Sequence, residues 1–292
     1  MTARSVARRL EAYAQLMRLD RPIGTWLLLW PVLWALWIAG AGRPPERVLI
    51  IFVLGVFVMR AAGCVINDFA DRNIDPQVKR TRDRPLAARR LSPYEALVLF
   101  GVLIAIALWL VTRLDPLTIK LSVVGALLTV SYPLMKRWFP LPQFYLGLSF
   151  GGWGIPMAFA ATLGAIPRVG WVLFLAAVLW AMVFDTLYAM VDREDDRKLG
   201  VRSSALLFAD MDRLIVGAMQ AMMLFALYLA GRSMEFGPWY RAGLAAAAIF
   251  FLWQQWIIRK REPTACLHAF LNNNHVGMVI FIGILLDHVY RV

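Results

Sequence analysis

Residues 93–130 read PYEALVLFGVLIAIALWLVTRLDPLTIKLSVVGALLTV, which is two apolar runs separated by a short polar turn. A helix that crosses a membrane needs about 20 consecutive, mainly apolar residues. Each run approaches that length, and the turn around residues 113–115 leaves no room for a domain between them. The stretch therefore predicts two antiparallel membrane helices joined by a tight turn.

The same pattern continues along all 292 residues of the chain. The chain is 60% hydrophobic and 17% charged, whereas soluble domains are about 45–50% apolar and about 25% charged. We therefore predict an all-α membrane protein whose residues 23–292 form one domain of nine transmembrane helices. The expected helices cover residues 23–40, 47–66, 94–112, 116–134, 142–163, 170–190, 214–231, 240–258 and 274–290.

The charge and the cysteines exclude several other classes of protein. The net charge is +12, but the apolar runs argue against nucleic acid as a partner and favour anionic lipid or an anionic substrate. The cysteines, Cys64 and Cys266, lie about two hundred residues apart. That spacing indicates neither a disulfide framework nor a metal motif.

Residues 1–22 predict an amphipathic helix that lies on the membrane surface. Val6, Leu10, Tyr13 and Met17 fall on one helical face, and most of the arginines fall elsewhere. The alternative interpretation of this segment is a frayed polar tail.

The basic residues predict the orientation in the membrane. If the N-terminus is cytoplasmic, 22 lysines and arginines lie on the cytoplasmic side and 7 on the opposite side. Because cytoplasmic loops of membrane proteins are enriched in lysine and arginine, this asymmetry favours a cytoplasmic N-terminus.

Two acidic motifs lie at predicted cytoplasmic helix ends. Residues 67–75 read NDFADRNID and residues 192–196 read DREDD. Helical spacing predicts that the carboxylates of each motif share a face. The candidate metal ligands are Asn67, Asp68, Asp71, Asp75, Asp192 and Asp196, and the candidate catalytic residues are Asp71, Asp75, Asp192 and Asp196.

Clustered carboxylates repel one another, and at a helix C-terminus they also oppose the helix dipole. Mg²⁺ would offset both effects, since it prefers oxygen ligands and commonly joins carboxylates to phosphates. The alternative is that these are solvated loop charges next to arginines.

Basic residues close to the acidic motifs suit an anionic substrate, because arginine and lysine are the usual partners of phosphate oxygens. The positive-inside pattern alone also requires such residues, so both explanations stay open. The candidates for binding such an anion are Arg72, Lys79, Arg82, Arg84 and Lys136.

Three further features of the sequence lie outside these motifs. Asp185 and Arg60 lie inside predicted spans, where a charge needs a partner, so they are site candidates or each other's partner. Gly147 and Gly151 indicate close helix packing. The run Asn272–274 before the last predicted span is typical of a helix N-terminus.

These motifs resemble those of a known family. NDFADRNID at residues 67–75, DREDD at 192–196 and YPLMK at 132–136 resemble the signatures of the UbiA superfamily of intramembrane aromatic prenyltransferases. LDRPIGTWLLLWP at 19–31, RTRDRPLA at 80–87 and YAMVDREDDRKLG at 188–200 look like the branch that serves bacterial ubiquinone synthesis.

The resemblance implies nine helices around a central cavity with a cytoplasmic cap, in the bacterial inner membrane. It also implies that both acidic motifs hold Mg²⁺, which holds a polyprenyl diphosphate. The expected reaction transfers the polyprenyl chain to 4-hydroxybenzoate, ortho to its hydroxyl, and releases diphosphate. The alternatives are a prenyltransferase with another aromatic acceptor and an ion-coupled transporter.

The carboxylate of 4-hydroxybenzoate would need a cation in a cavity of low dielectric constant. Arg137 is the first candidate, because it follows the YPLMK motif, and Arg21 is the second. The candidate residues around the aromatic acceptor are Arg137, Arg21, Tyr132 and Asp185.

Overall fold

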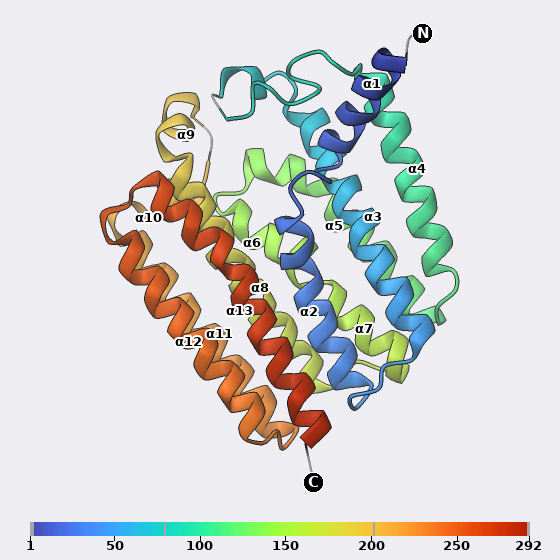
Figure 1. Ribbon diagram of the computed structural model, residues 1–292, viewed down its shortest axis with the longest axis vertical. Coiled ribbons are helices and arrows are strands. Elements are labelled where there is room, and N and C mark those ends of the chain that lie inside the picture. The colour runs from blue at the N-terminus through green and yellow to red at the C-terminus, as the bar shows by residue number, and fades with distance from the viewer. Residues whose placement is uncertain (1–2, 79, 201, 291–292) are drawn as a thin grey trace. The chain divides into compact units, whose positions relative to one another are not determined.

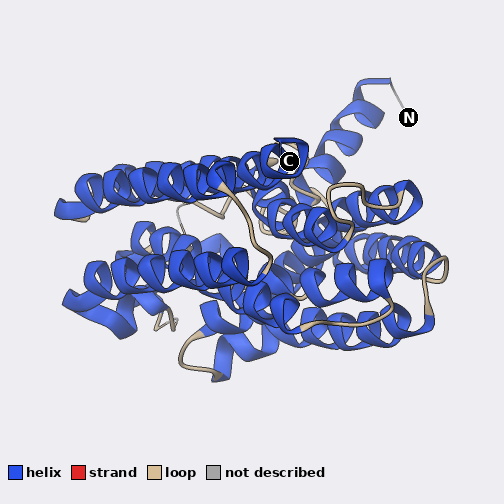
Figure 2. Ribbon diagram, turned by 90° about the horizontal axis from the view of Figure 1, so that it is seen from below, coloured by secondary structure: helices blue, strands red, loops and turns tan. Residues whose placement is uncertain are grey.

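The computed structural model describes residues 3–78, 80–200 and 202–290, and it describes the backbone alone at residues 3–5, 134, 136, 137 and 199. Within these ranges the chain forms helices and loops without a strand (Figures 1 and 2). The long helices are α1 (Ala3–Leu16), α2 (Ile23–Ala39), α3 (Glu46–Asp71), α4 (Pro93–Val111), α5 (Pro116–Trp138), α8 (Arg168–Val191), α11 (Asp212–Ser233), α12 (Pro238–Ile257) and α13 (Pro263–Tyr290).

Short helical segments complete the described chain. They are the 3₁₀ turns η1 (Asp75–Gln77), η3 (Ala209–Met211) and η4 (Ile258–Lys260), the π-helical segment η2 (Gly147–Gly152), and α6 (Pro142–Leu146), α7 (Gly154–Leu163), α9 (Arg193–Leu199) and α10 (Ser204–Phe208).

Eight helical segments of the described chain are long and apolar enough to cross a membrane, and α2 is an apolar helix of 17 residues. The prediction of an all-α membrane protein is therefore confirmed, whereas the count of nine spans stays a prediction. α3 extends five residues beyond its predicted end at residue 66, and α13 begins eleven residues before its predicted start at residue 274.

The earlier start of α13 corrects the interpretation of Asn272–274 as a helix N-terminus. These three residues lie in the middle of α13, and each side-chain oxygen accepts a hydrogen bond from a different helix. The donors are Trp30 on α2, Trp180 on α8 and Gln254 on α12, at 2.8–2.9 Å. Inside a membrane, hydrogen bonds of this kind join neighbouring helices.

The described chain divides into two compact units. The first unit contains Met1–Thr25 and Ile51–Arg113, and the second contains Trp26–Ile50 and Leu114–Val292. In the first unit, Leu16 of α1 is buried together with Val65 of α3 and Leu103 of α4. In the second unit, Leu187 of α8 is buried together with Val216 of α11 and Ala269 of α13. The division at residues 22 and 23 that we predicted from the sequence stays a prediction.

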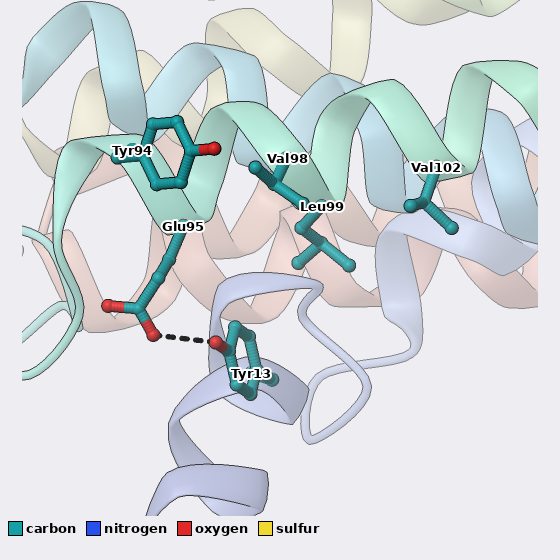
Figure 3. Close-up of a pocket in the computed structure, with 6 residues that line it drawn as sticks. All are labelled: Tyr13, Tyr94, Glu95, Val98, Leu99 and Val102. Carbon is teal, nitrogen blue, oxygen red and sulfur yellow. Dashed lines mark hydrogen bonds between the residues drawn. The ribbon is translucent and has the colours of Figure 1, made fainter.

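Polar contacts hold α1 against the first turn of α4. Ser92 and Glu95 form a capping box at the start of α4, and the Tyr13 hydroxyl of α1 donates to Glu95 Oε1 at 2.6 Å (Figure 3). A pocket of about 340 Å³ lies beside this contact, lined by Tyr13, Tyr94, Glu95, Val98, Leu99 and Val102. It contains no residue of the first acidic motif, so we do not regard it as the active site.

The predicted close packing at Gly147 and Gly151 is confirmed within the second unit. A Cβ atom at Gly147 would lie 2.9 Å from the carbonyl oxygen of Val178, and one at Gly151 would lie 2.5 Å from Ala181 Cβ. Both neighbours belong to α8, so glycine lets η2 approach α8 more closely than a residue with a side chain would allow.

Candidate active site

The first acidic motif lies at the C-terminal end of α3 and in the turn that follows. α3 ends at Asp71, and Asp75 begins η1, so Asp68, Asp71 and Asp75 do not lie on one continuous helical face as the sequence predicted. Pro76 is consistent with this break, because it has no N–H with which to continue the helical i→i−4 hydrogen bonds and instead lies at the start of η1. All three carboxylates are nevertheless buried, with exposed fractions of 1%, 7% and 5%.

Two arginines form ion pairs with two of these carboxylates, Asp68 and Asp75. Arg18 Nη2 donates to both carboxylate oxygens of Asp68, at 2.8 and 2.9 Å. Arg84 Nη1 donates to Asp68 at 3.0 Å and to Asp75 at 3.0 and 3.2 Å. Arg84 therefore brings together two carboxylates that the break in the helix would otherwise separate.

Burial raises the pKa of the Asp75 carboxyl above its ordinary value, and the Arg84 guanidinium opposes that shift. Removing water from a carboxylate disfavours its charged form, whereas a nearby cation favours it. Arg84 thus helps Asp75 to remain ionised.

Arg18 was not among the residues predicted from the sequence. It lies fifty positions before Asp68 in the chain, so no helical spacing could connect the two. One signal was available, since Arg18 follows directly on the apolar face of α1, which packs against α3 and α4. Its backbone has a φ of 59°, which is rare for a residue other than glycine and marks the turn after α1.

The other candidates near the first motif have contacts within their own segment. Asn67 Nδ2 donates to Asp71 Oδ2 at 3.3 Å. Arg72 donates to the Phe69 carbonyl oxygen at 2.7 Å and lies 4.5 Å from the Phe69 ring. Arg82 lies 3.8 Å from its neighbour Asp83 and is mostly exposed. Lys79 lies outside the described residues.

The second acidic motif lies where α8 ends and α9 begins. Asp192 joins the two helices, and the Asp196 N–H donates to the Asp192 carbonyl oxygen at 2.9 Å. The predicted helical spacing of Asp192 and Asp196 is therefore present. Both residues are half-buried.

Asp212 was also missed by sequence reasoning. It is the first residue of α11 and is fully buried, and its carboxylate accepts hydrogen bonds from Arg193 of α9 and from Arg261. Arg193 immediately follows Asp192, so this cluster adjoins the second acidic motif. Asp212 lies outside any recognisable motif, and only the packing of α11 reveals its partners.

The candidates for the aromatic acceptor lie in both units. In the second unit, the Tyr132 ring of α5 packs edge-on against Phe150 at 5.9 Å, and Asp185 lies half-buried in α8. In the first unit, Arg21 is exposed and lies 3.6 Å from Asp20. Lys136 and Arg137 belong to α5, but their side chains lie outside the described part of the structure.

The donors of each motif taken separately suit a hard divalent cation, because they are carboxylate oxygens, joined in the first motif by one amide. Among the described residues, no group of three or more His, Cys, Asp or Glu side chains is arranged to hold a metal ion. Mg²⁺ does not need such a group, since it usually takes one or two carboxylates together with phosphate oxygens and water. The residues therefore fit magnesium held jointly with a phosphorylated substrate.

The chain is similar to known proteins along nearly its whole length. The family model described as "UbiA prenyltransferase family" matches residues 28–281. The 4-hydroxybenzoate octaprenyltransferase of Alkalilimnicola ehrlichii is 56% identical over 98% of this chain and 98% of its own. That of Nitrosococcus oceani is 57% identical over 96% and 98% of the two chains.

Solved structures show the same fold. A UbiA homolog from Aeropyrum pernix K1 superposes with a TM-score of 0.77 at 25% identity, covering 89% of this chain and 97% of its own. A UbiA homolog from Archaeoglobus fulgidus, solved with GPP and Mg²⁺, has a TM-score of 0.72 at 15% identity, covering 94% and 99%. The resemblance predicted from the motifs is confirmed, and the chain is an integral membrane protein that belongs to the UbiA prenyltransferase family.

Proposed function

We propose that this protein transfers a polyprenyl chain from a polyprenyl diphosphate to 4-hydroxybenzoate, at the ring carbon ortho to the hydroxyl, in ubiquinone synthesis. The observation that carries the proposal is the 56% identity, over 98% of both chains, to a 4-hydroxybenzoate octaprenyltransferase. The aligned region covers 98% of the chain, which is long enough to span both acidic motifs and the YPLMK segment. The relatives' name indicates an octaprenyl donor.

Magnesium is the proposed cofactor, and when bound it would neutralise negative charge on the departing diphosphate. Asp71, Asp75, Asp192 and Asp196 are the proposed ligands, with Asn67 and Asp68 as further oxygen donors. The magnesium reported with the Archaeoglobus fulgidus homolog supports this choice of cation.

The chain's own cations are proposed to hold the diphosphate oxygens. Arg72, Lys79, Arg82 and Lys136 are the proposed ligands, and Arg84 contributes charge while it bridges Asp68 and Asp75. The burial of the first motif's carboxylates supports this arrangement, because electrostatic interactions are stronger where water is excluded. A water-poor site also protects an allylic cation from capture by water.

The aromatic acceptor is proposed to bind with its carboxylate against Arg137 or Arg21. Tyr132 and Asp185 are the other proposed contacts, and both are half-buried in the second unit. An arginine is the suitable partner because its planar fork matches a carboxylate.

The function is tested with purified protein, Mg²⁺, octaprenyl diphosphate and a panel of aromatic acids. We expect 4-hydroxybenzoate to be prenylated with release of one diphosphate per product, and benzoate, which lacks the activating hydroxyl, to be unreactive. Mass spectrometry of the product and a diphosphate assay measure the two quantities. A tenfold preference for another acceptor would identify a different member of the family.

We also propose that the site faces the cytoplasm of a bacterial inner membrane, with α1 on the membrane surface. The positive-inside asymmetry supports this orientation. The exposed apolar side chains of Val6 and Leu10 support contact of α1 with lipid.

The orientation can be tested with a matched pair of cysteines on the two sides of α4. Asp83 is 90% exposed in the loop before α4, and Arg113 is exposed just after it. In a background that lacks Cys64 and Cys266, we expect an impermeant maleimide to label Arg113→Cys in intact cells. Asp83→Cys should be labelled only after the inner membrane is opened, and the reverse result would contradict the orientation.

A further inference from the structure

Asp212 is a fully buried carboxylate that pairs with arginines from two other segments of the second unit. Its exposed fraction is 0%. Arg193 of α9 donates to it, Arg261 Nε donates to both its oxygens at 3.0 and 3.2 Å, and the Arg213 N–H donates at 2.6 Å. A single carboxylate thus meets two guanidinium groups beside the second acidic motif.

Arg193 is the link between Asp212 and that motif. It is the first residue of α9, directly after Asp192, and it lies three positions before Asp196. In a helix, an arginine and an aspartate at this spacing are close enough to pair. An unrestrained Arg193 would therefore compete with a metal ion for the carboxylates of the motif.

The structure holds Arg193 elsewhere. Its guanidinium is directed to Asp212 at the start of α11, and its Nε is buried without a hydrogen-bond partner among the described residues. Arg261 also holds Asp212, and its Nη2 donates to the Asp210 carbonyl oxygen at 2.7 Å.

We infer that Asp212 is a positioning residue for the second acidic motif: it withdraws Arg193 from Asp192 and Asp196 and thereby raises the affinity of the motif for a divalent cation. The inference rests on the proposed role of this motif in holding the metal. It extends that role to a residue in α11 that does not touch the substrate.

The first test measures metal binding directly. Mn²⁺ stands in for Mg²⁺, and the loss of its free-ion EPR signal on addition of the purified protein, relative to a protein-free blank, reports binding to the protein. We expect Asp212→Asn to weaken Mn²⁺ binding roughly 10–100-fold, the range found when partners of metal ligands are removed. Asp212→Glu keeps the charge and should retain most of the affinity.

Asp287→Asn is the matched control. Asp287 is 2% exposed and lies in the same unit, but it accepts the Gly237 and Tyr240 N–H groups at the start of α12. This variant should lose thermal stability and keep wild-type Mn²⁺ affinity. A similar loss of Mn²⁺ affinity in both variants would reduce the role of Asp212 to general stability and overturn the inference.

The second test is rescue. In the double variant Asp212→Asn, Arg193→Gln the competing cation is gone, so Mn²⁺ affinity should return to within about threefold of wild type. If the double variant binds Mn²⁺ no better than Asp212→Asn alone, the inference is wrong. Should Asp212→Asn fail to fold, Arg193→Gln and Arg261→Gln decide the matter: both must keep wild-type affinity, and a tenfold loss in either contradicts the inference.

These outcomes separate the inference from the proposed function. A wild-type protein that binds Mn²⁺ but does not prenylate 4-hydroxybenzoate would refute the proposed function. The Mn²⁺ affinities of the variants would then still test the role of Asp212. An active wild-type protein whose affinity is unchanged by Asp212→Asn would refute only the inference. No Mn²⁺ binding by the wild type would overturn the inference together with the magnesium proposal.

Discussion

Asp71→Ala and Asp192→Ala are each expected to lower the rate of prenyl transfer about 1,000-fold or more, since each removes an oxygen proposed to hold the metal that stabilises the departing diphosphate. Asp71 is almost fully buried at the end of α3, and Asp192 joins α8 to α9. The measurement is the initial rate of product formation by the purified variants at saturating Mg²⁺ and polyprenyl diphosphate.

The loss of activity must come from the missing carboxylate and not from a failure of the variant to fold. Each variant should therefore elute as a single species in detergent, with thermal unfolding close to that of the wild type. Asp83→Ala is the control, because this exposed aspartate lies in the same loop region as the first motif and outside it. EDTA should abolish wild-type activity and Mg²⁺ should restore it. Full activity in metal-free wild-type protein, or in either alanine variant, would refute the mechanism.

Arg84→Ala should both destabilise the first unit and reduce turnover. Its guanidinium is shared by Asp68 and Asp75, so its removal leaves Asp75 without this cation and leaves Asp68 with Arg18. Removing one partner of a buried ion pair typically costs about 3–5 kcal/mol. We expect a loss at the lower end of that range, because Arg84 is partly exposed and Asp68 keeps a second partner.

Unfolding by SDS titration measures the loss of stability, and the steady-state rates measure the loss of turnover. Arg84→Lys should recover only part of the stability and part of the turnover, since its single ammonium group replaces the planar guanidinium fork. Arg90→Ala is the control, because this exposed arginine of the same loop donates to a backbone carbonyl oxygen, that of Asp83, and to no carboxylate among the described residues. If Arg84→Ala raises only the KM for polyprenyl diphosphate and keeps full stability, Arg84 serves the substrate and not the carboxylates.

The membrane segments and the motifs could be predicted from the sequence because both are local properties. A span is a run of about 20 apolar residues, and the predicted ranges coincide with helices such as α2 and α4 to within one or two residues at each end. The first motif was recognised from its amino-acid sequence, although the prediction that a single helix carries all of it was wrong. The helix α3 ends at Asp71, and Asp75 lies with Pro76 in a separate 3₁₀ turn.

Only the tertiary structure decided which partners the polar residues have. Asn272–274 look like a helix cap in the sequence, yet three different helices donate to them in the middle of α13. Trp180 and Trp30 lie more than ninety positions away in the chain, so no periodicity could reveal them.

The same distinction applies to the charges. The sequence determined by itself that this is a multi-helix membrane protein with two acidic motifs and an excess of basic residues, because apolar length, spacing and net charge are read along the chain. It could not determine that Arg18 and Arg84 pair with Asp68 and Asp75, or that Arg193 pairs with Asp212. The chain has 31 lysines and arginines, and which of them reaches a buried carboxylate depends on how the helices pack.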